Sequence, residues 1–150
     1  MTIVVAIDGP AGSGKGTIAK KISSLYKFPH LDSGILYRSV AYLCQTAEEI
    51  DFSEENVLRH ARKLNLDEIE VSNLRTKEID DISSKISSFT SLREFLKSYQ
   101  LDFKKIHSDK KGIVVDGRDI TTIIFPDAEI KFYITAVSYT HLRAHETPTN

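Results

Sequence analysis

The sequence has a single cysteine and no hydrophobic run long enough to span a membrane. Cys44 cannot form an internal disulfide and falls in an apolar helical pattern, so we expect a small buried residue in a reducing compartment rather than a catalytic thiol. A spanning helix needs about 20 apolar residues, and the apolar start at residues 3–7 is too short for a signal peptide. We therefore expect a cytoplasmic protein without membrane contact.

The sequence also lacks an excess of charge of either sign, since 20 Lys and Arg residues stand against 21 Asp and Glu residues. Nucleic-acid-binding domains are usually strongly basic, so this balance argues against a nucleic-acid partner. The 150 residues, 41% of them hydrophobic, are enough for one domain with its own core. We expect a monomer whose partners are small molecules.

Short apolar runs alternate with helical patterns along the chain. Residues 3–7 form a continuous apolar run rich in β-branched side chains, as in a strand that is buried on both faces of a parallel sheet. Residues 113–115 and 130–134 are predicted as further strands, and residues 30–32 form a shorter extended piece. Helical periodicity separates these runs. The alternation predicts an α/β fold with a parallel sheet.

The segment between residues 35 and 110 is predicted to be mostly helical. Ser53 is expected to cap one helix, with Phe52 and Val57 as a hydrophobic staple, and Ser91 with Glu94 is expected to form a capping box for another. Residues 65–75 are polar and irregular, and no element is predicted there.

A glycine-rich segment follows the first predicted strand and opens a helix, which is the context of a phosphate-binding loop. Glycines let successive backbone N–H groups surround an anion, and the helix N-terminus adds partial positive charge. Lys15 supplies a full positive charge for the β and γ phosphates, and the loop alone indicates either ATP or GTP. The residue after Lys15 is Gly16, where most such loops have Ser or Thr, and the hydroxyl comes at Thr17. The predicted cofactor-binding residues, which bind ATP where the family resemblance below applies, are Gly9, Pro10, Ala11, Gly12, Ser13, Gly14, Lys15, Gly16 and Thr17.

Few other residues carry a chemical signal. Asp116 ends an apolar strand and is placed to position Mg²⁺ or its water ligands beside a phosphate loop. His30, His60 and His107 show neither metal-ligand spacing nor a recognisable carboxylate partner, so we expect structural histidines and no metal bound by protein ligands alone.

Four stretches together resemble the bacterial cytidylate (CMP/dCMP) kinase family, with matches from about Ile3 to Thr135. The last three are narrower signals than the phosphate loop. The stretches are Ile7-Asp8-Gly9-Pro10; Leu31-Asp32-Ser33-Gly34 with Tyr37-Arg38; Leu74-Arg75-Thr76 followed by Ser83-Ser84-Lys85; and Asp116-Gly117-Arg118-Asp119 with Phe125-Pro126-Asp127-Ala128.

The resemblance implies a three-layer P-loop fold with an acceptor-binding insertion at about residues 35–110. It also implies transfer of the γ-phosphoryl group of ATP to CMP, and to dCMP, with Mg²⁺. The acceptor nucleotide would be held by Ser33, Arg38, Ser84, Arg93, Arg118 and Asp119, with Arg75 bracing the pocket, and catalysis would depend on Lys15, Arg118 and Asp116.

Two departures from the family pattern qualify this expectation. The insertion is too short for the small antiparallel sheet that the family usually carries, so it should be reduced and helical. Residues 1–136 form the predicted kinase core, whereas residues 137–150 resemble a translated sequencing adapter and are expected to be a non-native tail. The family's arginine-bearing lid would follow Ala136, so we expect this chain to bind nucleotides and turn them over poorly.

Two alternatives remain open from the sequence. One is a P-loop kinase for another small acceptor, such as AMP, UMP or shikimate. The other is a nucleotide-binding fragment without catalysis. Comparing binding with turnover across several monophosphates separates these three functions.

Overall fold

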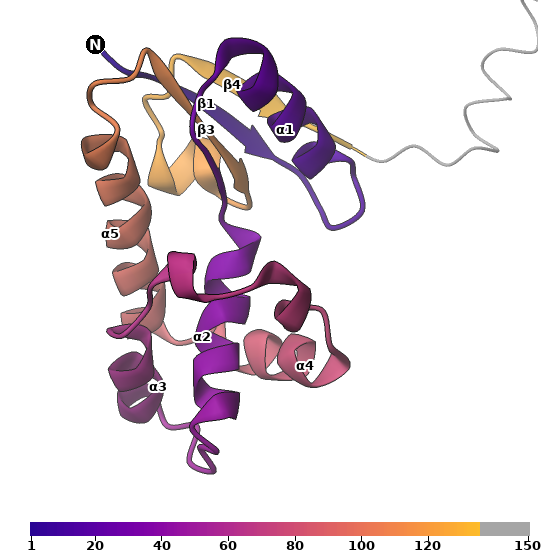
Figure 1. Ribbon diagram of the computed structural model, residues 1–150, viewed down its shortest axis with the longest axis vertical. Coiled ribbons are helices and arrows are strands. Elements are labelled where there is room, and N and C mark those ends of the chain that lie inside the picture. Colours follow the sequence, from indigo (N-terminus) through magenta and orange to yellow (C-terminus); the bar gives the residue numbers. More distant parts are fainter. Residues whose placement is uncertain (136–150) are drawn as a thin grey trace, which may run out of the picture.

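A computed structural model describes residues 1–135, and the predicted tail at residues 137–150 lies outside them. Four strands form one sheet in the order β2-β3-β1-β4, and every neighbouring pair is parallel (Figure 1). The strands are β1 (Ile3–Asp8), β2 (His30–Asp32), β3 (Gly112–Gly117) and β4 (Ile130–Tyr133). The predicted α/β class with a parallel sheet is confirmed.

Strand β1 is apolar throughout because both of its faces are covered. Side chains alternate across a strand, so Val5 and Ile7 pack with Ala19 of α1 (Lys15–Tyr26) on one face. Val4 and Ala6 join the larger core on the other face. Helices therefore cover both sides of the sheet, in three layers (Figure 1).

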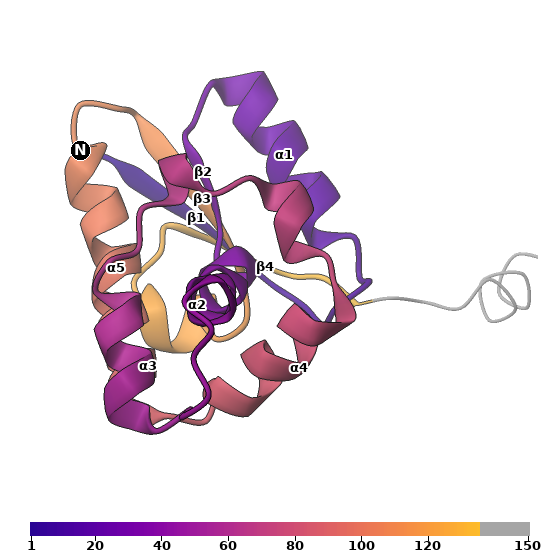
Figure 2. The same cartoon turned by 60° about the horizontal axis from the view of Figure 1, so that its bottom comes forward.

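Between β2 and β3 the chain forms only helices and connecting turns. The long elements are α2 (Gly34–Thr46), α3 (Glu54–Ala61), α4 (Lys77–Ile86) and α5 (Thr90–Ile106). Two short 3₁₀ helices, η1 (Leu66–Glu68) and η2 (Val71–Leu74), occupy the stretch where no element was predicted. Helix α2 lies at the centre of this group, with α3, α4 and α5 around it (Figure 2).

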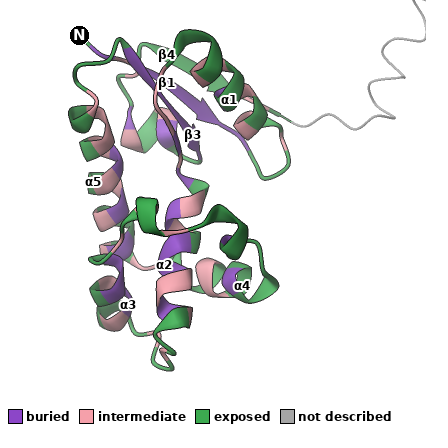
Figure 3. Ribbon diagram, in the orientation of Figure 1, coloured by how far each residue is buried: buried purple, intermediate pink, exposed green. Residues whose placement is uncertain are grey.

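Helix α2 contributes the centre of the helical core. Leu36, Val40, Ala41 and Cys44 are fully buried, and α2 carries buried residues along much of its length (Figure 3). Cys44 is thus the small buried residue that the sequence predicted. Burial, with a smaller contribution from Glu49, raises the pKa of its thiol to about 11, so it is protonated at neutral pH.

One predicted helix start is confirmed and another is wrong. Ser53 caps α3, since its hydroxyl accepts a hydrogen bond from Asn56 N at 3.3 Å. Ser91 does not form a capping box with Glu94, because α5 already begins at Thr90. Instead, the N–H and the hydroxyl of Ser91 both donate to Glu54 Oε1, each at 2.9 Å. The cap of α5 therefore comes from α3.

Strand β3 leads into a π-helical turn, η3 (Ile120–Ile124), before β4. Strand β4 is the sheet edge within the described residues, and its Phe132 and Tyr133 are 42% and 70% exposed. None of the helices in residues 1–135 is long and apolar enough to cross a membrane.

Candidate nucleotide-binding cleft

The glycine-rich loop connects the carboxyl end of β1 to the N-terminus of α1, as the sequence predicted. Gly12 and Gly14 have φ values of 76° and 90°, a backbone conformation that side chains with a Cβ rarely adopt. Gly14 is the N-cap of the 12-residue α1, and no side chain caps that end. The free N–H groups of the first turn therefore remain available to an anion.

Lys15 lies on the first turn of α1 beside this loop. Its Nζ donates one hydrogen bond, to Pro10 O at 3.3 Å, and makes no ion pair within the described residues. An ammonium group has three donors, so Lys15 keeps donors for phosphate oxygens. The loop backbone, the helix N-terminus and this lysine fit the polyphosphate of a nucleoside triphosphate.

One cleft of about 850 Å³ joins this loop to the helical part of the molecule. Ala11, Gly12, Lys15 and Gly16 line it on the loop side. The other predicted ATP-binding residues, Gly9, Pro10, Ser13, Gly14 and Thr17, belong to the loop but are not part of the cleft lining.

All six predicted acceptor residues line the same cleft, although they come from four segments of the chain: α2 with its N-cap, α4, α5 and the turn after β3. They are Ser33, Arg38, Ser84, Arg93, Arg118 and Asp119. Arg75, in contrast, is exposed and does not contribute to the lining. The fold therefore brings the predicted donor and acceptor residues to one place.

Asp116 lies at the end of β3 with 1% of its surface exposed. Its Oδ1 is bonded to Nε2 of His30, at the start of the neighbouring β2. The expectation that His30 has no carboxylate partner is therefore wrong, and the same holds for His60, whose Nε2 lies 2.9 Å from Glu49 Oε2. A Cβ built on Gly16 would be 4.0 Å from Asp116 Oδ2, so the carboxylate lies beside the phosphate loop.

Ser33 and Gly117 fix how the ends of β2 and β3 meet. The N–H of Ser33 donates to Asp116 O at 2.9 Å. A Cβ at Gly117 would lie 1.7 Å from Ser33 Oγ and 3.1 Å from Ser33 Cβ, so a larger residue there would displace the hydroxyl. The glycine after Asp116 therefore leaves room for the Ser33 hydroxyl in its present position, where Ser33 lines the cleft.

Arg38 and Asp119 show two further features of the cleft. The Nε of Arg38 lies 3.3 Å from Asp80 Oδ1 of α4, and both side chains are about half exposed. Asp119 has a φ of 59°, which is uncommon for a residue other than glycine.

Tyr37 lies in the same cleft lining. Burial raises the pKa of Tyr37, while the nearby Arg93 lowers it and Asp119 raises it. Tyr37 therefore lies within the electrostatic reach of Arg93 and Asp119, two of the predicted acceptor residues.

Sequence reasoning missed Tyr37, His30 and Asp8 as contributors to this region. Tyr37 precedes Arg38 in a stretch that carried the family resemblance, so its position was available as a signal. The partners of His30 and Asp8 are 86 or more residues away, and no local pattern indicates them.

No group of three or more His, Cys, Asp or Glu side chains within residues 1–135 is arranged to hold a metal ion. Magnesium in phosphoryl-transfer sites is commonly bound by one or two carboxylates together with substrate phosphates and water. Asp116 is the predicted carboxylate that lies beside the phosphate loop.

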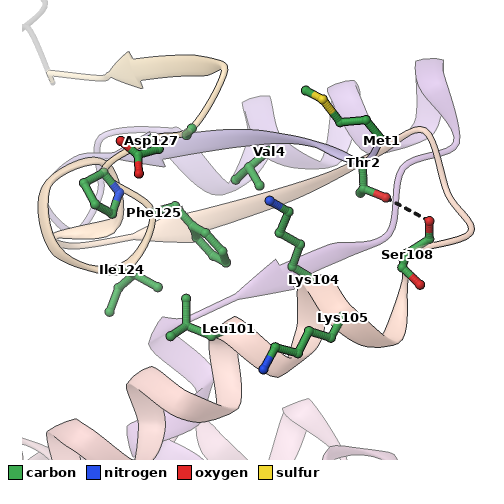
Figure 4. A pocket seen from close by; sticks show the side chains of 12 residues that line it. Met1, Thr2, Val4, Leu101, Lys104, Lys105, Ser108, Ile124, Phe125 and Asp127 are labelled. Atoms are coloured by element: carbon green, nitrogen blue, oxygen red, sulfur yellow. Dashed lines mark hydrogen bonds between the residues drawn. The ribbon is translucent and has the colours of Figure 1, made fainter.

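A second hollow, of about 610 Å³, lies at the opposite, amino end of the strands (Figure 4). Val4, Leu101 and Phe125 give it apolar walls, and Lys104 and Lys105 of α5 lie at its side. It contains none of the predicted catalytic, ATP-binding or acceptor residues. The predicted acceptor residues instead line the cleft beside the phosphate loop, at the carboxyl end of β1, which is where parallel α/β sheets usually bind ligands.

A parallel sheet with helices on both faces and a glycine-rich phosphate loop after its central strand defines a P-loop α/β protein of the kinase type. The family model for cytidylate kinase matches residues 5–147. That range extends into the segment that the sequence analysis assigned to a non-native tail.

Curated proteins named cytidylate kinase are similar over most of this chain. Those of Bartonella bacilliformis and Bartonella quintana are 48% and 43% identical over 134 and 133 residues, and each match covers 89% of this chain and 60% of the relative. That of Acidiphilium cryptum is 44% identical over 138 residues, covering 89% of this chain and 61% of the relative. The chain therefore belongs to the cytidylate kinase family, and it spans about 60% of the length of these relatives.

Proposed function

We propose that this protein is a kinase that transfers the γ-phosphoryl group of ATP to CMP, and to dCMP. The observation that carries the proposal is the single cleft that joins the phosphate loop to all six acceptor residues. Phosphoryl transfer needs the donor and acceptor to be held in line and their charge to be neutralised, with little covalent chemistry by the protein. A cleft shared by both sites meets the first requirement.

The donor half depends on the loop and Lys15. The backbone N–H groups at the start of α1 bind the phosphates, and the free donors of Lys15 bind the β and γ phosphates. Magnesium, when bound with ATP, neutralises part of the phosphate charge. Asp116, beside the loop, would help to hold the cation through water, and His30 is bonded to Asp116 and fixes its side chain.

The acceptor half depends on residues from the helical segment and from the end of β3. Arg38 binds the monophosphate, because a guanidinium offers two parallel donors to phosphate oxygens. The cytosine edge presents an amine donor and ring and carbonyl acceptors. A carboxylate (Asp119) and a guanidinium (Arg93) complement that edge, and Ser84 adds a hydroxyl. Arg118, which precedes Asp119 in the cleft lining, is the residue that we assign to the transferring phosphate.

Calorimetric titration of CMP, dCMP, UMP and AMP tests the choice of acceptor. The carboxylate and guanidinium predict that CMP and dCMP bind at least about tenfold more tightly than UMP or AMP, since each mismatched charged contact is worth about 1.5–3 kcal/mol. A preference for AMP or UMP would favour the alternative of a kinase for another acceptor.

Turnover needs a separate measurement because the chain covers about 60% of its relatives. We propose that the 150-residue chain binds nucleotides and forms CDP slowly. The control is a chain continued after Ala136 with the C-terminal part of the Bartonella bacilliformis relative. The family's lid arginine would follow Ala136, and an arginine that reaches the transferring phosphoryl group is worth roughly 10³–10⁵ in rate. If the turnover rates of the two chains differed by less than about tenfold, the proposal would be contradicted. Binding without CDP formation by the longer chain would favour a nucleotide-binding function instead.

A further inference from the structure

Asp8 is a buried carboxylate that the proposed chemistry does not use. It ends β1, directly before the phosphate loop, and 5% of its surface is exposed. Its side chain accepts three hydrogen bonds from two consecutive residues. Oδ1 accepts from Ile120 N at 2.8 Å, and Oδ2 accepts from Thr121 N at 3.0 Å and from Thr121 Oγ1 at 2.5 Å.

These three donors lie immediately after the two cleft residues Arg118 and Asp119. The first N–H groups of a helical turn have no partner within the turn, and Asp8 provides one for Ile120 and Thr121 of η3. Asp119, with its φ of 59°, is the N-cap of η3 and has no side-chain capping bond of its own. An uncommon backbone conformation persists only where its surroundings enforce it. Asp8, at the end of β1, constrains the backbone of Asp119 by binding the two residues that follow it.

Asp8 also borders the phosphate loop, which is the proposed ATP site. Gly9, which follows Asp8, donates from its N–H to Gly117 O at 3.3 Å, so the two chain segments remain paired where the loop begins. The carboxylate of Asp8 continues this pairing to residues 120 and 121. The start of the phosphate loop and the Arg118–Asp119 turn are therefore tied together by one side chain.

We propose that Asp8 is a positioning residue that holds Arg118 and Asp119 in register with the phosphate loop, so that the acceptor is aligned with ATP. This inference rests on the proposed function, because it assigns those two residues to the acceptor. Asp8 acts through the N–H groups and the hydroxyl that it binds, and it is not part of the cleft lining.

The sharpest test removes a single donor to Asp8. Thr121→Val keeps the shape of the side chain and deletes the hydroxyl, and Thr122→Val is the matched control, since Thr122 is exposed and has no side-chain hydrogen bond within the described residues. Calorimetry measures CMP and ATP separately, well below the melting temperature of each variant. We expect Thr121→Val to weaken CMP binding by roughly fivefold or more and ATP binding by less than twofold, since a bond to a charged acceptor is lost. Thr122→Val should change neither.

A double-mutant cycle then tests whether Thr121 acts through Asp8. Asp8→Asn keeps one acceptor oxygen and places an amide N–H against a donor, so it should also weaken CMP more than ATP. If both residues act through one contact, the double variant should lose clearly less CMP affinity than the product of the two single losses. Independent, multiplicative losses would overturn the inference.

Two further outcomes separate this inference from the proposed function. If the unaltered chain binds CMP, and Thr121→Val lowers the melting temperature but binds CMP equally well, Asp8 is merely structural and the inference alone is overturned. If the unaltered chain binds ATP but not CMP, the acceptor assignment fails, and this inference fails with it.

Discussion

His30 and Asp116 are bonded to each other at the carboxyl end of the sheet, where β2 and β3 run side by side. The side chain of His30 is 15% exposed, and that of Asp116 is almost fully buried. The pair joins the strand that leads to the acceptor residues to the strand that ends beside the phosphate loop. Its loss should therefore affect nucleotide binding as well as stability.

We predict that His30→Leu lowers the stability of the protein by about 1–3 kcal/mol or more, because it leaves the buried Asp116 carboxylate without its partner. It should also weaken ATP binding in the presence of Mg²⁺. His107→Leu is the control, since His107 bonds to Phe103 O on its own helix and does not line the cleft. Chemical denaturation and calorimetry measure the two effects. Equal ATP affinity in both variants would show that the pair does not support the donor site.

A second prediction concerns Lys15, whose Nζ makes one long hydrogen bond, to Pro10 O. Lys15→Met should weaken ATP binding by roughly 10–100-fold, since bonds between charged groups are worth about 1.5–3 kcal/mol. Lys21→Met, an exposed lysine on the same helix, should leave ATP binding unchanged. Melting temperatures of both variants should stay close to that of the unaltered chain. ATP affinity retained in Lys15→Met would refute the loop assignment.

A third prediction concerns base recognition. Arg93→Met and Asp119→Ala should each weaken CMP binding by roughly tenfold or more and ATP binding little, because each removes one member of a charge-assisted set. Arg75→Met is the matched control, as Arg75 is exposed outside the cleft. Titrations with CMP and ATP on all three variants measure the difference. Parallel losses of CMP and ATP would remove these residues from the acceptor pocket.

Features that depend on neighbouring residues in the sequence were predicted correctly, whereas contacts between residues far apart in the sequence were missed. Strands, the phosphate loop and the Ser53 cap were predictable, because their signals lie within a few residues. The contacts of His30, Glu54 and Asp8 were not, because their partners are 86, 37 and 112 residues away. The capping box at Ser91 failed for this reason: the pattern was present, but a carboxylate from another helix occupies the donors.

The cap of α5 leads to a prediction about pH. Hydrogen bonds from the N–H and then the hydroxyl of Ser91 hold the pKa of Glu54 below its ordinary value, with partial desolvation acting weakly in the opposite sense. A carboxyl group whose pKa is lower in the folded state binds fewer protons there than in the unfolded chain. Its contribution to stability is therefore fully present above the ordinary glutamate pKa and is lost as the pH falls through the lowered value.

Glu54→Gln should therefore lower the melting temperature at neutral pH, and the difference from the unaltered chain should shrink as the pH falls below about 4. Glu55→Gln is the matched control, because Glu55 is an exposed neighbour with no resolved hydrogen bond or ion pair in the described chain. It should show little difference at any pH. Glu49, whose pKa is lowered chiefly by its bond to His60, remains in both variants, so its acid sensitivity cancels from the comparison. Thermal unfolding followed by circular dichroism between about pH 3 and 7 measures these differences. A gap for Glu54→Gln that stays constant with pH would show that the charge of Glu54 does not contribute to capping α5.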